Sequence, residues 1–354
     1  MVLKRRTDSG KELAVVADRM DQPAMRTAGR RSAELVLEVR DLRTHFRTDD
    51  GVVRAVDGVS FTVRRGETLG IVGESGSGKS VACLSALRLV PTPPACHPSG
   101  EIHFAGRDLL ALPERELVQL RGNRLAMIFQ DPLTALNPYL TVARQLTEVL
   151  EVHQGATRAA AREAAIAMLT RVGIPDAGRR IDQHPHQFSG GMRQRVMIAM
   201  ALLCGPELLF ADEPTTALDV TIQAQILELI GELQASLGTA VVLVTHDLGV
   251  VAGTTDRVAV MYAGKIVEAG TTAEVFANPV HPYTRGLLAS MPRIDTPPRD
   301  RLEAIPGLPP DLGHLPAGCP FHPRCQLATD RCRREYPETV TLSATHQAAC
   351  WEGN

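Results

Sequence analysis

Apolar residues occur along this chain in short runs, separated by polar and glycine-rich segments. Short apolar runs rich in valine, isoleucine and leucine are typical of buried β-strands. One further segment, residues 59–63, alternates apolar and polar positions, which predicts a strand with a single buried face. We therefore expect the strands of an open α/β sheet at residues 35–39, 59–63, 68–72, 101–105, 125–129, 208–213 and 240–245.

Residues 141–173 include alanine-rich sequence with high helix propensity, and Gly173, Pro175 and Gly178 end the pattern. This helical stretch lies between two strand-rich halves of the chain. We expect it to form a subdomain of its own, over about residues 131–203. Further helices are expected at residues 80–87, 190–203 and 220–229.

Composition narrows the class of protein. The net charge of -2 and the pI near 6.6 give no electrostatic reason to expect a nucleic-acid partner, and aromatic residues make up only 4% of the chain. No apolar run approaches the roughly 20 residues of a membrane span. No apolar segment of signal-peptide type follows the basic residues near the N-terminus. We expect a soluble cytoplasmic protein whose membrane role, if any, depends on a partner.

A glycine-rich stretch directly follows the predicted strand 68–72 and opens the next helix. It has the pattern G-x-x-x-x-G-K-S, in which glycines let backbone amides converge on a phosphate and the helix N-terminus adds a positive dipole. Lys79 is expected to contact the β- and γ-phosphates of a nucleotide, and the Ser80 hydroxyl to ligate Mg²⁺. The alternative is a glycine-rich turn that binds nothing. The stretch comprises Gly73, Glu74, Ser75, Gly76, Ser77, Gly78, Lys79 and Ser80.

Polar residues follow three other predicted strands, at Gln130, Asp212-Glu213 and His246. Ligand groups gather at the carboxyl ends of strands in open α/β sheets, so we expect these side chains to converge. Gln130 is expected to orient a water and touch Mg²⁺, and Asp212 to hold Mg²⁺. Glu213 is the candidate general base, and His246 the candidate hydrogen-bond partner of the γ-phosphate. A single Gln or His after a strand is weak evidence by itself, and a structural acidic pair is the alternative for Asp212-Glu213.

The string Ser189-Gly190-Gly191-Met192-Arg193-Gln194 opens another predicted helix. Ser189 is a favourable N-cap, and the two glycines expose amides that suit an anion. A simple helix start would explain the same residues.

Seven cysteines fall into two groups. Cys83, Cys96 and Cys204 are scattered, and packing explains them. The other four follow the spacing C-x5-C-x6-C-x17-C, and four thiolates suit either a [4Fe–4S] cluster or a tetrahedral zinc ion, with His322 and His346 as further zinc ligands. Free cysteines with structural roles are the remaining alternative. The four are Cys319, Cys325, Cys332 and Cys350.

Taken together, the order and spacing of these motifs resemble those of ATP-binding-cassette (ABC) ATPases over about residues 34–280. The resemblance implies a phosphate-loop α/β core, an antiparallel β subdomain and a helical subdomain that carries the signature Ser189–Gln194. It implies a head-to-tail dimer, in which Ser189, Gly190, Gly191 and Gln194 face the other subunit's ATP and the loop at Asp219 lies between subunits. Phe46 could stack on adenine or belong to the core. Residues 1–33 are predicted to be a disordered tail.

Finer features resemble the ATPases of dipeptide and oligopeptide importers: residues 130–138, 278–288, 305–310 and 319–325. This resemblance implies a C-terminal domain over 281–354 with a [4Fe–4S] cluster, zinc being the alternative. It implies ATP and Mg²⁺ as ligands, a related second ATPase subunit, two permease subunits and, indirectly, an extracytoplasmic solute-binding protein. The expected location is the cytoplasmic face of a bacterial plasma membrane. Nickel and glutathione importers share parts of the tail, so the solute stays open.

Two other classes of protein are alternatives to an importer ATPase. Soluble cassette proteins of DNA repair or translation usually carry two cassettes, coiled-coil arms or basic patches, whereas this chain has one cassette and a slight negative charge. A metal-sensing protein built around the cysteine tail is the other alternative. Co-purification with two hydrophobic permease chains separates an importer ATPase from both.

Overall fold

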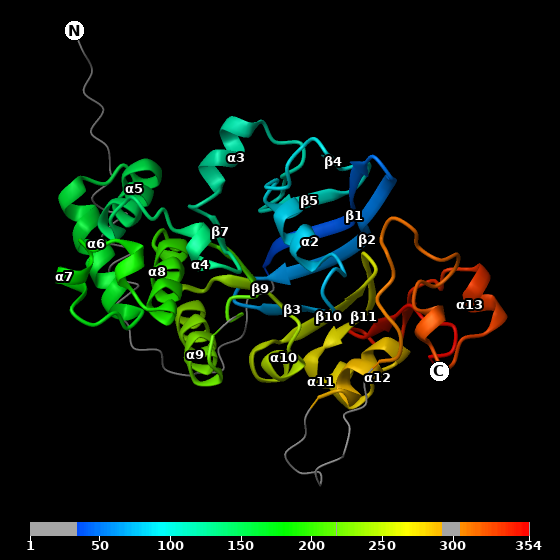
Figure 1. The fold of residues 1–354 in the computed structure, drawn as a ribbon. Coiled ribbons are helices and arrows are strands. Elements are labelled where there is room, and N and C mark those ends of the chain that lie inside the picture. Colours follow the sequence, from blue (N-terminus) through cyan, green and yellow to red (C-terminus); the bar gives the residue numbers. More distant parts are fainter. Residues whose placement is uncertain (1–33, 217, 292–304, 354) are drawn as a thin grey trace. The chain divides into compact units, whose positions relative to one another are not determined.

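A computed structural model describes residues 34–216, 218–291 and 305–353 (Figure 1). Two compact units make up the chain. One is formed by Pro113–Val241, and the other by Leu35–Leu112 together with Val242–Asn354. The predicted disordered tail, residues 1–33, lies outside the described residues, as does Ala217.

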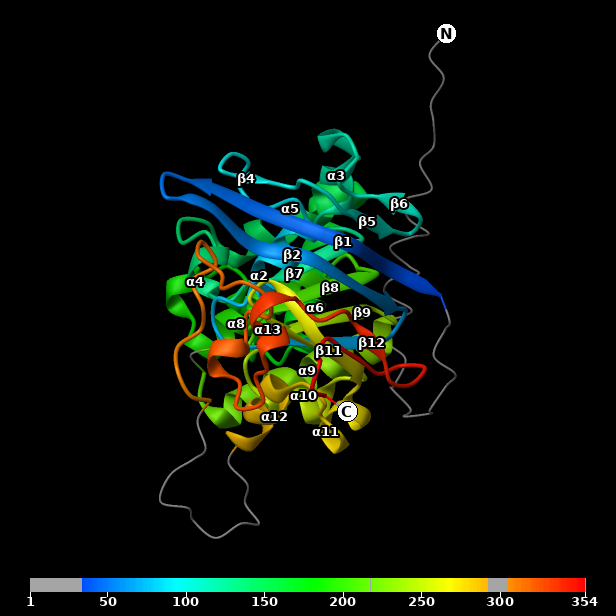
Figure 2. The same cartoon turned by 90° about the vertical axis from the view of Figure 1, so that its right-hand side faces the viewer.

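An antiparallel sheet opens the second unit. Its strands follow the order β2-β1-β5-β6, with β4 paired to β1. The strands β1 (Leu35–Thr48) and β2 (Gly51–Arg64) run side by side over their whole length (Figure 2). This is the antiparallel β subdomain that the family resemblance implies.

A second sheet of this unit holds the strand that precedes the glycine-rich stretch of residues 73–80, here named the phosphate loop. From the edge inward its order is β12-β13-β11-β10-β3. β3 (Thr68–Val72) pairs in parallel with β10 (Arg257–Tyr262), and every residue of β3 is buried. Strands buried on both faces read as continuous apolar runs, which explains why the bounds of β3 and of β9 (Ala240–Thr245) agree with those predicted.

The first unit is largely helical. Residues 141–173 form two helices, α5 (Val142–Gln154) and α6 (Arg158–Arg171), separated at Gly155, which has a left-handed backbone. The strands β7 and β8 of this unit pair in parallel.

The predicted end of α9 at Leu229 was wrong. The helix spans Val220–Leu237 because Ile230 and Leu233 continue its buried face. It ends at Gly238, whose amide donates to the Gln234 carbonyl and whose left-handed backbone (φ 68°) turns the chain out of the helix.

The remaining elements of the first unit are α3 (Glu114–Leu120), β7 (Leu125–Ile128), α4 (Pro132–Ala135), α7 (Ala177–Arg180), η1 (Pro185–Gln187), α8 (Gly190–Leu202) and β8 (Leu208–Asp212). Those of the second unit are α2 (Lys79–Ala86), β4 (Ala95–Cys96), β5 (Glu101–Phe104), β6 (Arg107–Asp108), α10 (Leu248–Thr254), β11 (Lys265–Thr271), α11 (Thr272–Ala277), α12 (Pro282–Ala289), η2 (His322–Arg324), α13 (Asp330–Arg334), β12 (Val340–Thr341) and β13 (Gln347–Ala348).

One apolar core of the second unit joins the phosphate-loop strand to the C-terminal segment. It contains Val72 and Val260 of the sheet together with Tyr283 of α12 and Phe321, which precedes η2. The C-terminal segment therefore packs as part of this unit. Within the described residues, no helix is both long enough and apolar enough to cross a membrane.

Candidate nucleotide and cysteine sites

The phosphate loop, residues 73–80, has a backbone that glycine alone fits at two positions. Gly73 and Gly78 have φ angles of 154° and 101°. A Cβ atom on Gly73 would lie 2.2 Å from the Met261 carbonyl oxygen, and one on Gly78 would lie 2.1 Å from that of Ala55. The two glycines thus allow the loop to lie directly against neighbouring backbone.

Inside the loop, Lys79 is only 5% exposed, and its Nζ donates to the carbonyl oxygens of Gly73 (2.8 Å) and Glu74 (2.9 Å). These two hydrogen bonds fix the Lys79 ammonium group against the backbone of the loop. The buried Ser77 hydroxyl has no hydrogen-bond partner among the described residues, and Ser80 is half-buried at the start of α2. A cationic group and an unpartnered hydroxyl inside a glycine-rich loop fit a phosphate ligand.

Two other predicted site residues belong to this unit. Phe46 is half-buried in β1, where its backbone is paired with Val53 and Ala95. His246 directly follows β9 and is exposed, and the next residue, Asp247, caps α10 through its carboxylate.

In the other unit, the structure brings Gln130 and Glu213 together. Gln130 Nε2 donates to Glu213 Oε2 over 3.1 Å, and the Thr216 hydroxyl donates to the same oxygen over 2.8 Å. Asp212, at the end of β8, is 6% exposed. Glu213 itself has a φ of 46°, which is rare for a residue with a side chain. Backbone strain of this kind tends to persist where function requires it.

The signature segment has the helix start that its sequence predicts. The Ser189 hydroxyl accepts from the Met192 amide as the N-cap of α8, and Ser189 and Gly190 are exposed. Gln194 differs from its neighbours, since it is 2% exposed and donates to the Pro214 carbonyl within the same unit. Asp219 is exposed at the N-terminus of α9, and its carbonyl accepts from the Gln223 amide.

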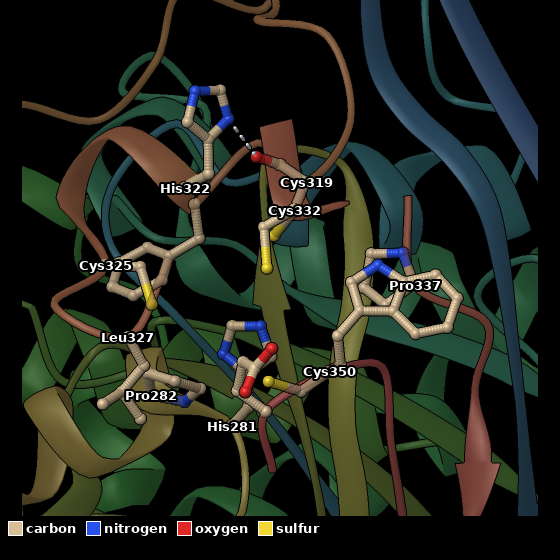
Figure 3. Close-up of a pocket in the computed structure, with 12 residues that line it drawn as sticks. His281, Pro282, Cys319, His322, Cys325, Leu327, Cys332, Pro337 and Cys350 are labelled. Atoms are coloured by element: carbon tan, nitrogen blue, oxygen red, sulfur yellow. Dashed lines mark hydrogen bonds between the residues drawn. The ribbon is translucent and has the colours of Figure 1, made fainter. Parts of the chain in front are cut away.

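The four C-terminal cysteines line one cavity, which is partly open to solvent (Figure 3). All are free thiols. Burial and, to a smaller extent, the neighbouring thiols raise the pKa of Cys319 to about 11. Burial also raises the pKa of Cys325 and of Cys350. A site for an electropositive ligand, which would lower these pKa values, fits the donor set.

The four cysteine side chains nevertheless do not have the arrangement of a metal site in the described structure. Among the described residues, no group of three or more histidine, cysteine or acidic side chains is arranged to hold a metal ion. His281 and His322 line the cavity with the cysteines, as does Trp351, whose ring lies 3.3 Å from the Arg331 guanidinium. No sequence pattern identified His281 as a residue of this cavity.

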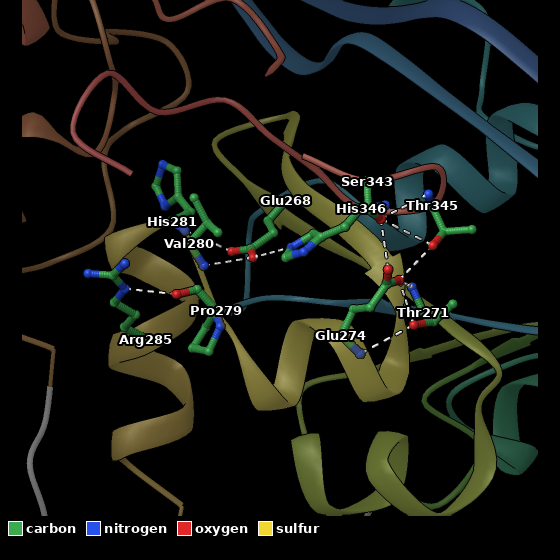
Figure 4. Close-up of polar contacts among 10 residues, drawn as sticks. All are labelled: Glu268, Thr271, Glu274, Pro279, Val280, His281, Arg285, Ser343, Thr345 and His346. Atoms are coloured by element: carbon green, nitrogen blue, oxygen red, sulfur yellow. Dashed lines mark hydrogen bonds and ion pairs between the residues drawn. The ribbon is translucent and has the colours of Figure 1, made fainter. Parts of the chain in front are cut away.

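His346, a predicted zinc ligand, lies away from this cavity. Its Nε2 contacts Oε1 of the fully buried Glu268 at 2.8 Å (Figure 4). The same carboxylate accepts from the amides of Val280 and His281. Glu268 therefore ties the C-terminal hairpin β12–β13 to the segment that starts α12, a structural role that the sequence analysis missed.

Comparison with known proteins agrees with this architecture. Residues 56–216 match the family described as ABC transporter, and residues 267–332 match the C-terminal region of oligopeptide and dipeptide transporters. Among solved structures, the dimeric post-hydrolysis state of the ATP-binding cassette MJ0796 bound to ADP and Pi is similar, with a TM-score of 0.60 and 27% identity. The similarity covers 67% of this chain and 98% of that one. Fold and phosphate loop thus define an ABC ATPase.

Similarity to curated proteins narrows the class. The probable peptide ABC transporter ATP-binding protein y4tR of Sinorhizobium fredii is 54% identical, over 93% of this chain and 98% of its own length. The dipeptide transport ATP-binding protein DppD of Bacillus subtilis is 54% identical, over 90% of this chain and 95% of its own. The oligopeptide transport protein OppD of the same species is 53% identical, over 89% and 88%. The chain belongs to the family of peptide ABC transporter ATP-binding subunits.

Proposed function

We propose that this chain hydrolyses ATP to power the import of peptides through a membrane permease. The observation that carries the proposal is the extent of similarity to peptide transport proteins, which reaches 90–93% of the chain and includes the C-terminal region. Nickel or another small solute is the alternative cargo, because importers of such solutes share parts of the tail sequence. A soluble cassette protein of repair or translation is not favoured, because such a role leaves the transporter-type C-terminal region unexplained.

The residue roles follow from chemistry and from each residue's position. Lys79 binds the β- and γ-phosphates, and Glu213 is the general base for the attacking water. Gln130 donates to the Glu213 carboxylate, which suits an orienting role. His246 contacts the γ-phosphate. Mg²⁺, held by Ser80, Asp212 and Gln130, would neutralise phosphate charge.

The working form is a head-to-tail dimer with a second, related ATPase chain. The segment Ser189-Gly190-Gly191, of which Ser189 and Gly190 are exposed, and the exposed Asp219 face the partner subunit and its nucleotide. Phe46 stacks on the adenine. Gln194, which is bonded inside its own unit, supports the signature helix from within. ATP binding closes the dimer and hydrolysis opens it, a two-state equilibrium that the nucleotide biases.

Two permease subunits receive this motion through the Gln130 segment and the helical subdomain. An extracytoplasmic solute-binding protein delivers the peptide. The chain then acts as a peripheral subunit at the cytoplasmic face of the bacterial plasma membrane.

For the C-terminal domain, we propose a [4Fe–4S] cluster bound by Cys319, Cys325, Cys332 and Cys350, with zinc as the alternative. The shared cavity and the free state of all four thiols support it. Its role is structural, because the C-terminal segment has few apolar residues of its own. Anaerobic purification followed by iron, sulfide and zinc analysis tests the assignment. Stoichiometric zinc without sulfide would overturn it, and absence of any metal would leave the cysteines as ordinary thiols.

The transport assignment is tested with the chain co-expressed with two permease subunits and a second ATPase chain. Right-side-out membrane vesicles of this complex, with ATP enclosed and the solute-binding protein added outside, are expected to take up a labelled dipeptide. The Lys79→Ala complex is the matched control and is expected to be inactive. ATP-dependent uptake of nickel without uptake of peptides would replace peptide by nickel as the cargo.

A further inference from the structure

Glu74, in the phosphate loop, is held by the C-terminal part of the chain. Its carboxylate accepts two hydrogen bonds from Arg324, one from Nη1 (2.6 Å) and one from Nη2 (2.9 Å), although the two residues are 250 positions apart. Its amide donates to the Tyr283 hydroxyl over 2.8 Å. Its carbonyl accepts from Lys79. All three polar groups of Glu74 are therefore engaged, two of them by C-terminal residues.

The Arg324 contact has the geometry of a strong ion pair. Two parallel hydrogen bonds between a guanidinium and a carboxylate fix both groups in direction as well as distance. The Arg324 side chain is only 5% exposed, so solvent screens the pair weakly. Arg324 Nε also donates to the Pro306 carbonyl over 2.9 Å, which fixes the guanidinium within the C-terminal segment itself.

Tyr283 is anchored just as firmly. It is fully buried, and its ring packs against Tyr262 and Phe321 with centroid distances of 4.6 and 5.5 Å. Such aromatic packing leaves the hydroxyl little freedom. The Glu74 amide therefore meets an acceptor whose position is set by the core.

Fixing Glu74 also affects Lys79, the residue proposed to bind the phosphates. Lys79 Nζ bonds the carbonyl oxygens of Gly73 and Glu74, so a rotation of the Glu74 peptide would displace one of its two acceptors. A loop held in its binding shape loses less conformational entropy when the ligand arrives.

We propose that Arg324 and Tyr283 are positioning residues for the phosphate loop, which act through Glu74 and raise its affinity for ATP. Neither residue needs to contact the nucleotide for this effect. The inference rests on the proposed role of residues 73–80 in phosphate binding. It gives the C-terminal segment a function in the ATPase cycle that is separate from metal binding.

The test measures binding of a fluorescent ATP analogue to the purified full-length chain, together with its melting temperature. Arg324→Met is expected to weaken binding about tenfold, on the scale of one hydrogen-bonded charge pair. Tyr283→Phe removes only the hydroxyl and keeps the ring packing, so a weaker affinity in that variant reports the Glu74 contact directly. In the assembled ATPase, both variants are expected to raise the KM for ATP and to leave kcat nearly unchanged.

Three comparisons decide the outcome. Arg331→Met is the matched control, because Arg331 lies in the same segment but pairs with Glu335 and stacks on Trp351. It is expected to bind ATP normally. Arg324→Lys keeps the charge and should restore part of the affinity. A double variant, Arg324→Met with Glu74→Gln, should bind ATP no more weakly than Arg324→Met alone. Both substitutions disrupt the same ion pair, the one between Arg324 and Glu74.

Unchanged affinity in folded Arg324→Met and Tyr283→Phe would overturn the proposal, and additive losses in the double variant would show that Arg324 does not act through Glu74. If Arg324→Met fails to fold, Tyr283→Phe alone decides. Lys79→Ala is measured alongside. Normal ATP binding in Lys79→Ala would overturn the assignment of residues 73–80 as the phosphate site. Failure of that assignment can therefore be told apart from failure of the positioning role of Arg324 and Tyr283.

Discussion

Replacing Glu213 by glutamine tests the catalytic assignment most directly. One carboxylate oxygen of Glu213 accepts from both Gln130 (3.1 Å) and Thr216 (2.8 Å). A glutamine side chain can present its carbonyl oxygen to the same two donors, so we expect the local structure and ATP binding to survive Glu213→Gln. An amide is a poor base, however, and should not take a proton from the attacking water.

The expected loss can be put on a free-energy scale. General-base catalysis contributes about 10²–10⁴-fold to a rate, which corresponds to about 2.7–5.4 kcal/mol of activation free energy. Because binding is kept and hydrolysis is lost, the variant complex should accumulate with ATP bound and the dimer closed.

Single-turnover hydrolysis in the assembled complex measures this effect, because it separates chemistry from product release. The companion ATPase chain must carry an inactivating change of its own, so that its site does not supply turnover. Thr216→Val is the matched variant. It removes one donor to the carboxylate but keeps the carboxylate, and should slow hydrolysis less than Glu213→Gln. Hydrolysis at the native rate in Glu213→Gln would refute the assignment of Glu213 as the base.

Three further outcomes are expected. Lys79→Ala should lose most nucleotide binding in a titration with labelled ATP, because charge-assisted phosphate contacts are the strong ones; native affinity would exclude the loop as the phosphate site. Cys332→Ser should lose the bound iron and sulfide in elemental analysis and still bind ATP, whereas full iron content would remove Cys332 from the ligand set. In the metal-free chain at pH 8, Cys319 should be alkylated about a hundredfold more slowly than an exposed cysteine, since a pKa of about 11 instead of 9.0 lowers the thiolate fraction by that factor. Its alkylation rate should rise with pH until about pH 11, and a plateau near pH 9 would contradict the effect of burial.

Local patterns predicted the strands only in part. The strands β1 and β2 are longer than the predicted 35–39 and 59–63, and β10 and β11 were not predicted. β3 and β9 are continuous buried runs, so their bounds could be read directly from apolar sequence. The loop's glycines, too, are required by local geometry, in the backbone angles of Gly73 and Gly78.

Contacts between distant parts of the chain could not be predicted in the same way. Glu268 and His346 are 78 positions apart, and no local pattern indicates that they meet. The inward position of Gln194 depends on the chain at Pro214, 20 residues later. The end of α9 was missed because burial of Ile230 and Leu233 is decided by tertiary packing.

The position of Trp351 has a practical consequence for spectroscopy. It is the only tryptophan in the chain, and it lines the cavity that the four cysteines share. Tryptophan fluorescence of this chain therefore reports on a single position, because no other tryptophan contributes to the emission. Filling of the cavity by a coloured metal centre should quench this signal, and loss of the Arg331 stack should change its wavelength. The chain thus carries an intrinsic fluorescent probe of its C-terminal segment, which needs no added label.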